Sequence, residues 1–270
     1  MADLIIKQNE RLVRQDIITQ TGGYNVSQRY VPIATQDILT EIKEYTGVEP
    51  IITGFNNANV RKQEKNGFQK HALICEMPNS EMIDGTKMNM ILFNSNDRST
   101  SLKIHLGALR MACSNQMVWG EEIAEPVSVR HTNKEWKHSI HTLMDEYEEA
   151  QRKTQEMIDR MMNTYMSYGD IGRFTERVYE ELLQKDITGS VFDTMQLNSA
   201  HRKEDIGKDA WHTFNRVQYN VLNGGVDRII EKADDNGVLF DVISKTHKVS
   251  DSAKQIKFNK QLHNIIMETI

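Results

Sequence analysis

The order of hydrophobic patterns along the chain most constrains its fold. Apolar segments of strand length follow one another through the first half, and a long amphipathic stripe with helical spacing comes after them. The strand-like segments are 50–55, 68–77, 88–94, 101–106 and 127–131. Strands gathered ahead of helices are typical of α+β proteins. The sequence therefore predicts an α+β fold, with an N-terminal antiparallel β-rich half that includes a helix, followed by a helical half.

The helical stripe runs from 134 to 166 and predicts one long helix of about 50 Å. An earlier helix is expected from Thr35, as N-cap, to a stop at Gly47. Apolar residues at 109–117 also recur at intervals of three and four residues, so this segment could continue as a helix. That helix would carry Arg110, for which Asp97 is a candidate partner. Further helices are expected at 170–185, 208–223 and 252–268. These patterns divide the chain into a polar arm (1–34), a β-rich α+β core (35–133) and a helical region packed on that core (134–270).

Composition indicates a globular protein with an uneven charge distribution. Hydrophobic content is 39% and charged content 26%, and the formal net charge is -5. Eight basic side chains face five acidic ones from 55 to 110, whereas eleven acidic face six basic from 144 to 186. No window is apolar enough for a membrane span, and Cys75 and Cys113 lie in apolar surroundings typical of reduced core thiols. We expect an intracellular protein of the host-cell cytoplasm whose β-rich half could face a polyanion.

Sequence signatures of catalysis are missing. His131, His138 and His141, with His105 and Cys113, could converge on a metal, but their spacing matches no zinc motif and packing or surface histidines are the simpler interpretation. The chain also has no nuclease-type carboxylate pattern, no nucleophile elbow, and no Walker or Rossmann glycine loop. We therefore expect a protein that is not an enzyme, with no catalytic residues, no metal and no cofactor.

Three blocks carry a family resemblance. They are NSNDRSTSLKIHLGALRMACSNQMVWG from Asn94, the short VSVRHT segment, and DAWHTFNRVQYNVLNGG from Asp209. In this order they resemble the phage/plasmid-like protein family of unknown function, over roughly 50–225. The resemblance implies a bacteriophage or mobile-element origin and supplies no established activity. The order helix, three strands, helix from 37 to 117 is also similar to that of single-strand annealing recombinases, a likeness of element order that does not fix function.

Basic side chains and an aromatic ring in the β-rich half suggest nucleic-acid binding. Binding to single strands needs cations along the backbone path and planar groups on which bases stack. The alternative is a solvated hairpin loop with a core aromatic, since charge runs usually are solvated faces. The candidate nucleic-acid-binding residues are Arg61, Lys62, Lys65, Phe68, Lys70, Arg98, Lys103 and Arg110. By contrast, we interpret Trp211, Phe214 and Tyr219 as core residues in preference to a stacking platform.

Two functional hypotheses follow. The preferred one is a phage-encoded, non-enzymatic nucleic-acid-binding protein that oligomerises, favours single-stranded DNA and acts in strand binding or annealing during recombination. The other is a phage protein-interaction factor that inhibits or regulates a host protein through its acidic long helix. Methionines on that helix, such as Met157 and Met161, suit either adaptable packing or a contact with another copy of the chain. No membrane partner is expected.

Overall fold

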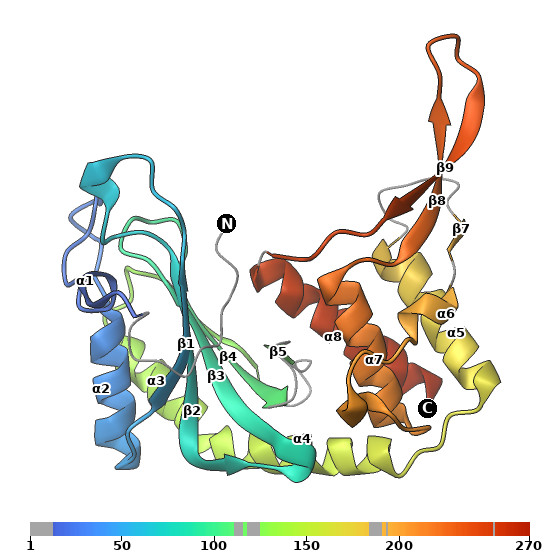
Figure 1. Cartoon of the computed structure of the whole chain (residues 1–270). Coiled ribbons are helices and arrows are strands. Elements are labelled where there is room, and N and C mark those ends of the chain that lie inside the picture. The colour runs from blue at the N-terminus through green and yellow to red at the C-terminus, as the bar shows by residue number, and fades with distance from the viewer. Residues whose placement is uncertain (1–12, 111–115, 118–124, 184–190, 193, 251) are drawn as a thin grey trace. The chain divides into compact units, whose positions relative to one another are not determined.

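The computed structural model describes residues 13–110, 116–117, 125–183, 191–192, 194–250 and 252–270 (Figure 1). The chain divides into two compact units, Met1–Gln155 and Glu156–Ile270, each considered by itself below. The division lies inside α4 (Tyr147–Met162). Helix α3 (Trp136–Asp145) therefore belongs to the unit that contains the larger sheet.

The first unit is built on an antiparallel sheet with the strand order β1-β2-β3-β4-β5, in which β6 also pairs with β4. Because consecutive strands are neighbours from β1 to β5, short connections suffice to join them. The strands are β1 (Ile51–Asn57), β2 (His71–Glu81), β3 (Thr86–Asn94), β4 (Leu102–Arg110), β5 (Gln116–Met117) and β6 (Val127–Val129). The predicted α+β class is confirmed.

Alternation along the strands places one set of side chains against the helices. Leu73, Cys75 and Met77 on β2 share a face with Met90 and Leu92 on β3, and all are buried in one core. Helices α1 (Gln15–Ile18), α2 (Thr35–Thr46) and α3 cover this face and contribute their own buried side chains to the same core (Figure 1). Single helical turns lie at Gln63–Lys65 and Ile83–Gly85.

Two predictions about the first unit need correction. The segment at 109–117 is no helix where it is described, because Leu109 pairs with Lys87 at the end of β4 and Gln116 begins β5. Strand pairing thus overrides a local helical repeat. The arm before residue 35 is not merely polar, since Ile17, Ile18 and Ile33 are almost completely buried.

The ends of the helices also differ in detail from the prediction. Helix α2 has Ala34 as its N-cap, whereas Thr35 is its first residue; it ends as predicted at Gly47, which adopts a left-handed φ of 72°. The long helix is interrupted at Glu146, which separates α3 from α4. The apolar stripe continues across the interruption, so the hydrophobic periodicity of the sequence could not predict the break between α3 and α4.

The second unit combines helices with a small sheet. The helices are α5 (Tyr168–Val178), which continues into a π-helical turn at Tyr179–Leu183, α6 (Thr194–Leu197), α7 (Ala210–Asn223) and α8 (Ser252–Thr269), with a 3-10 turn at Lys203–Asp205. Met161 is fully buried in this unit and the Met157 sulfur lies 2.8 Å from His263 Nε2 on α8. These methionines therefore pack within the chain, and a contact with another copy through them is not supported.

The small sheet was not predicted. Strands β7 (Val191–Phe192), β8 (Asp227–Ala233) and β9 (Leu239–Lys245) form an antiparallel sheet in that order. The β8–β9 hairpin extends away from the helices of its unit (Figure 1). In the described portion of the chain, no helix is long and apolar enough to cross a membrane.

Candidate nucleic-acid interface

Two loops of the first unit meet at one end of the sheet. The connector 58–70 joins β1 to β2, and the turn 95–101 joins β3 to β4. The Asn96 amide donates to the carbonyl of Phe68 at 2.9 Å, and Lys65 Nζ lies 2.8 Å from Asp97 Oδ2. We call these two loops, together with the sheet residues that flank them, the basic end.

The basic end carries three exposed cations that were predicted as binding residues. Arg61 and Lys62 lie in the connector and Arg98 lies in the turn. Arg98 has a left-handed φ of 66°, so its side chain leaves the chain at a sharp bend. Within the described residues, none of the three forms an ion pair, so each guanidinium or ammonium group is available to an anion.

Two further predicted cations continue from the loops onto the sheet. Lys70 Nζ lies 5.8 Å from the centre of the Phe93 ring, within the range of a cation–π contact. Lys103 on β4 is exposed and pairs with Phe93 across the strands, so its side chain emerges on the same face. The two lysines therefore flank one aromatic residue near the basic end. Phe93 itself is buried and contributes support rather than an open stacking surface.

Lys65 and Asp97 hold the two loops together. The Asp97 side chain is 1% exposed and that of Lys65 is 34% exposed. Burial would raise the pKa of Asp97, but hydrogen bonds from Lys65 and Ser99 outweigh this and hold the pKa below its usual value. Lys65 is thus already neutralised by the protein and has a mainly structural role.

Two half-buried aromatic rings are attached to the same two loops. Phe68 and Tyr24 are tilted at 41° with their centroids 6.0 Å apart. The Tyr24 amide donates to the Asn96 carbonyl at 2.8 Å, which attaches this segment of the arm to the turn. Sequence reasoning identified Phe68 and missed Tyr24, because nothing local to residues 1–34 signals a contact with a turn some 70 residues later.

Arg110 does not belong to this site. It is the last residue of β4 and pairs with Thr86, at the far end of the strand from the turn 95–101. The partner that the sequence suggested for it, Asp97, is bound to Lys65 instead. The Arg110 side chain lies outside the described residues.

Buried hydrogen bonds explain why the Asn94 block has so many small polar residues. Asn94 Nδ2 donates to the Ile33 carbonyl at 2.8 Å and to Thr35 Oγ1 at 3.0 Å, and Asn94 Oδ1 accepts from the Ser95 amide at 2.9 Å. Ser95 and Thr100 bond each other across the turn, at 3.1 Å in both directions. The block fixes the turn and docks the arm, and these bonds build a structure rather than a catalytic set.

The same network fixes the protonation of His71. Its Nδ1 lies 3.1 Å from the Gln69 carbonyl, which can only accept, so Nδ1 carries the proton. Its Nε2 lies 2.7 Å from Thr35 Oγ1 and accepts the hydroxyl proton. Burial lowers the pKa of His71 to about 4. Nearby, burial and the charge of Asp97 raise the pKa of Tyr30 to about 12, and the Tyr30 hydroxyl donates to the Ser95 carbonyl at 3.0 Å.

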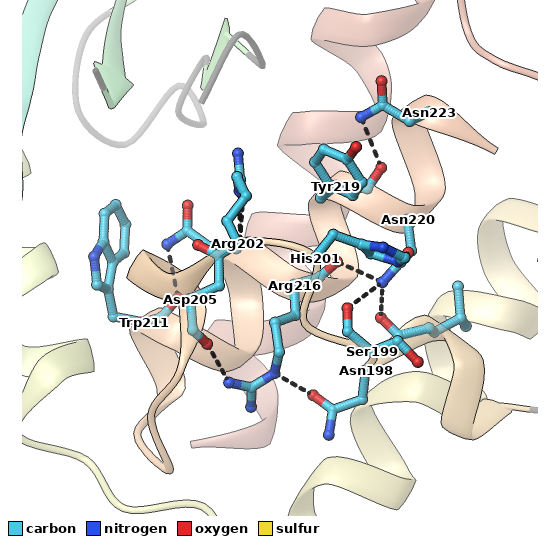
Figure 2. Close-up of polar contacts among 12 residues, drawn as sticks. Asn198, Ser199, His201, Arg202, Asp205, Trp211, Arg216, Tyr219, Asn220 and Asn223 are labelled. Atoms are coloured by element: carbon cyan, nitrogen blue, oxygen red, sulfur yellow. Dashed lines mark hydrogen bonds and ion pairs between the residues drawn. The ribbon is translucent and has the colours of Figure 1, made fainter. Parts of the chain in front are cut away.

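A second polar cluster lies around α7 in the other unit. Figure 2 shows the guanidinium of Arg216 reaching toward Asn198 and Asp205. Arg216 Nε donates to Asn198 Oδ1 at 2.8 Å, and Nη1 donates to the carbonyls of Asp205 and Gly207 at 2.6 and 2.8 Å. Burial lowers the pKa of Arg216 from its usual value. The contacts within the protein occupy this cation, so it positions the loop before α7.

Asn220 has a similar structural role on the next turn of α7. Its Nδ2 donates to the carbonyls of Leu197 and Ser199 at 2.9 and 3.0 Å, and its Oδ1 lies 2.9 Å from His201 Nε2 (Figure 2). Trp211 and Phe214 are almost completely buried, as the sequence predicted. The late helix therefore forms the core of its unit.

Comparison with known proteins identifies the family. The family described as "Domain of unknown function (DUF932)" matches residues 24–260, which is most of the chain. The protein belongs to the DUF932 family. This agrees with the predicted membership of a family of unknown function, whereas the likeness to annealing recombinases stays a prediction.

Two relatives of this DUF932 protein come from Escherichia coli (strain K12). "UPF0380 protein YafZ" is 26% identical over 242 residues, and the alignment covers 82% of this chain and 81% of the relative. "UPF0380 protein YfjQ" is 26% identical over 234 residues, with the same shares covered. No solved structure matches the chain.

Two of the histidines considered as metal ligands in this DUF932 protein have partners within the protein. His131 stacks on Tyr30 with 4.9 Å between centroids, and His141 Nε2 lies 2.7 Å from Glu41 Oε1. Among the described residues, no group of three or more His, Cys, Asp or Glu side chains is placed to hold a metal ion. Cys75 is 1% exposed, which confirms its burial; Cys113 lies outside the described residues.

Proposed function

We propose that this DUF932 protein binds single-stranded nucleic acid, with single-stranded DNA favoured, at the basic end of its sheet, and that it does so without catalysis. The proposal includes strand binding or annealing in recombination, in the cytoplasm of the host cell. The origin from a phage or mobile element, implied by the sequence resemblance, stays a prediction.

One observation carries the proposal: exposed cations that form no ion pair within the described residues share two joined loops with half-buried aromatic rings. Arg61 and Lys62 lie in the same connector as Phe68, Arg98 lies in the turn to which Tyr24 is bonded, and the Lys65–Asp97 pair joins the two loops. Cations contact phosphates without regard to sequence, and aromatic rings stack on bases that only a single strand leaves open. This combination favours a single strand over a duplex.

The competing hypothesis of a host-protein contact through the acidic helix has less support. On α4, Glu149 pairs with Arg152 at 2.7 Å and with Lys153 at 3.7 Å, so some of its acidic surface is neutralised within the helix. Glu149 is therefore less available to a partner protein than its sequence suggested.

Binding to labelled oligonucleotides tests the proposal. Fluorescence anisotropy with the full chain should give tighter binding to a single strand of about 20 nucleotides than to the same sequence as a duplex. The double variant Arg61→Glu/Lys62→Glu should bind the single strand at least about tenfold more weakly, because two phosphate contacts become repulsive.

A matched variant separates a local site from overall charge. Lys203→Glu/Lys208→Glu makes the same change in net charge at exposed positions of the other unit. It should bind nearly as well as the wild type. Equal weakening by the two double variants, or equal affinity of the wild type for single strand and duplex, would reject the basic end as a single-strand site.

A further inference from the structure

The β8–β9 hairpin exposes apolar side chains that its own unit does not cover. Ile229 and Ile243 are 36% and 73% exposed, and they lie directly opposite each other in the ladder. Directly opposite residues of an antiparallel pair share a face, so the two isoleucines form one apolar patch in the middle of the hairpin.

One edge of the hairpin is open within the described segments of the chain. The sheet order is β7-β8-β9, so β8 has a neighbour on each side whereas β9 is the last strand. An exposed edge strand presents backbone donors and acceptors and is a template for another strand. The apolar patch therefore lies next to an edge that can add a strand.

The charges on the patch face are arranged in an unusual way. Toward the base of the hairpin, Asp227 lies opposite Lys245, with 3.4 Å between Oδ1 and Nζ. Toward the tip, Glu231 lies directly opposite Asp241. Like charges directly opposite are destabilising, and among the described residues neither carboxylate forms an ion pair. The isolated hairpin thus lacks a cation beside Asp241.

We propose that β9 pairs antiparallel with β9 of a second copy of this chain, about a two-fold axis at Ile243. In this register Ile243 meets its own counterpart, and Asp241 meets Lys245 of the second copy, twice by symmetry. Four isoleucines, Ile229 and Ile243 from each copy, then form one continuous apolar strip. The register supplies the missing cation to the acidic pair and gives Ile243 a lateral apolar neighbour, its own counterpart, which argues for a second copy over an unrelated partner.

Sedimentation velocity tests the association. One strand pair is a small interface, so dimers are expected to accumulate over a range of about 1 to about 200 µM. Ile243→Lys should remain monomeric throughout. Ile206→Lys, which alters an isoleucine that is 72% exposed elsewhere in the same unit, should dimerise like the wild type. A wild type that stays monomeric throughout, or an Ile243→Lys variant that still dimerises, would overturn the proposal.

Cysteine crosslinking tests the register itself. Opposed Cα atoms in an antiparallel pair are about 4.5–5.5 Å apart, which a disulfide can span. Ile243→Cys should therefore form a disulfide-linked dimer under mild oxidation. Asp241→Cys should not, because its counterpart would be four residues away, at about 14 Å. The wild type corrects for native thiols. Crosslinking of Asp241→Cys in place of Ile243→Cys, or of neither variant, would overturn this register.

Discussion

Lowering the pH should destabilise the first unit through His71. In the folded chain His71 is 3% exposed and its pKa is about 4, whereas an unfolded histidine has a pKa of 6.5. A proton on Nε2 would face the hydroxyl proton of Thr35, and Thr35 Oγ1 already accepts from Asn94. The unfolded chain therefore binds the proton first as the pH falls.

The size of the effect follows from the two pKa values. The neutral imidazole contributes its full share to the free energy of unfolding above pH 6.5. This contribution is lost as the pH drops from 6.5 toward 4. Each pKa unit of difference is worth about 1.4 kcal/mol. Between pH 7 and pH 5, the free energy of unfolding should thus fall by about 2 kcal/mol because of His71 alone. His131, whose pKa burial also lowers, acts in the same direction.

Urea unfolding at pH 7 and pH 5, followed by circular dichroism, measures this loss. His71→Gln removes the titrating group and should lose about 2 kcal/mol less than the wild type over this interval. His138→Gln, at an exposed histidine, should behave like the wild type. Equal losses in His71→Gln and the wild type would refute the reasoning, as would an NMR titration in which the His71 imidazole protonates near pH 6.5.

Three further predictions concern single side chains. The thiol of Cys75, whose pKa burial raises to about 12, should react with a thiol reagent far more slowly in the native chain than in urea, and comparable rates would contradict its burial. Asp97→Asn should lower the free energy of unfolding by about 1.5 kcal/mol, because it removes the buried carboxylate that joins Lys65 to the turn; unchanged stability would show that the pair does not hold the loops together. Arg216→Met should cost about 3 kcal/mol in thermal or urea unfolding, since it leaves buried carbonyls without donors, and a loss below about 1 kcal/mol would show that the cluster is not structural.

Much of the fold could be predicted, because periodicity reports burial directly. Strands β1 to β4 and helices α7 and α8 lie close to their predicted positions, and Gly47 ends a helix as expected. The prediction of a helix at 109–117 was wrong because the apolar repeat there is short. The long pairing of β4 with β3 determines the structure of this segment instead. The β8–β9 hairpin was missed even though Asn236-Gly237, a strong hairpin signal, separates two runs of β-formers.

The candidate site was only partly predictable, because its geometry depends on contacts between distant residues. Charge alone indicated Arg61, Lys62 and Arg98. Charge could not distinguish them from Lys65, which the fold neutralises with Asp97. It also could not reveal Tyr24, which reaches the site through the Asn96 carbonyl.

The salt dependence of single-strand binding tests the central claim most directly. For a single strand, the logarithm of the affinity falls with the logarithm of salt concentration by about 0.7 for each phosphate contact. The account predicts a steep negative slope for the wild type, and a slope shallower by about 1.4 for Arg61→Glu/Lys62→Glu. The matched variant Lys203→Glu/Lys208→Glu should keep the wild-type slope. A wild-type affinity that does not change with salt, or the same slope in all three proteins, would contradict a nucleic-acid site at the basic end.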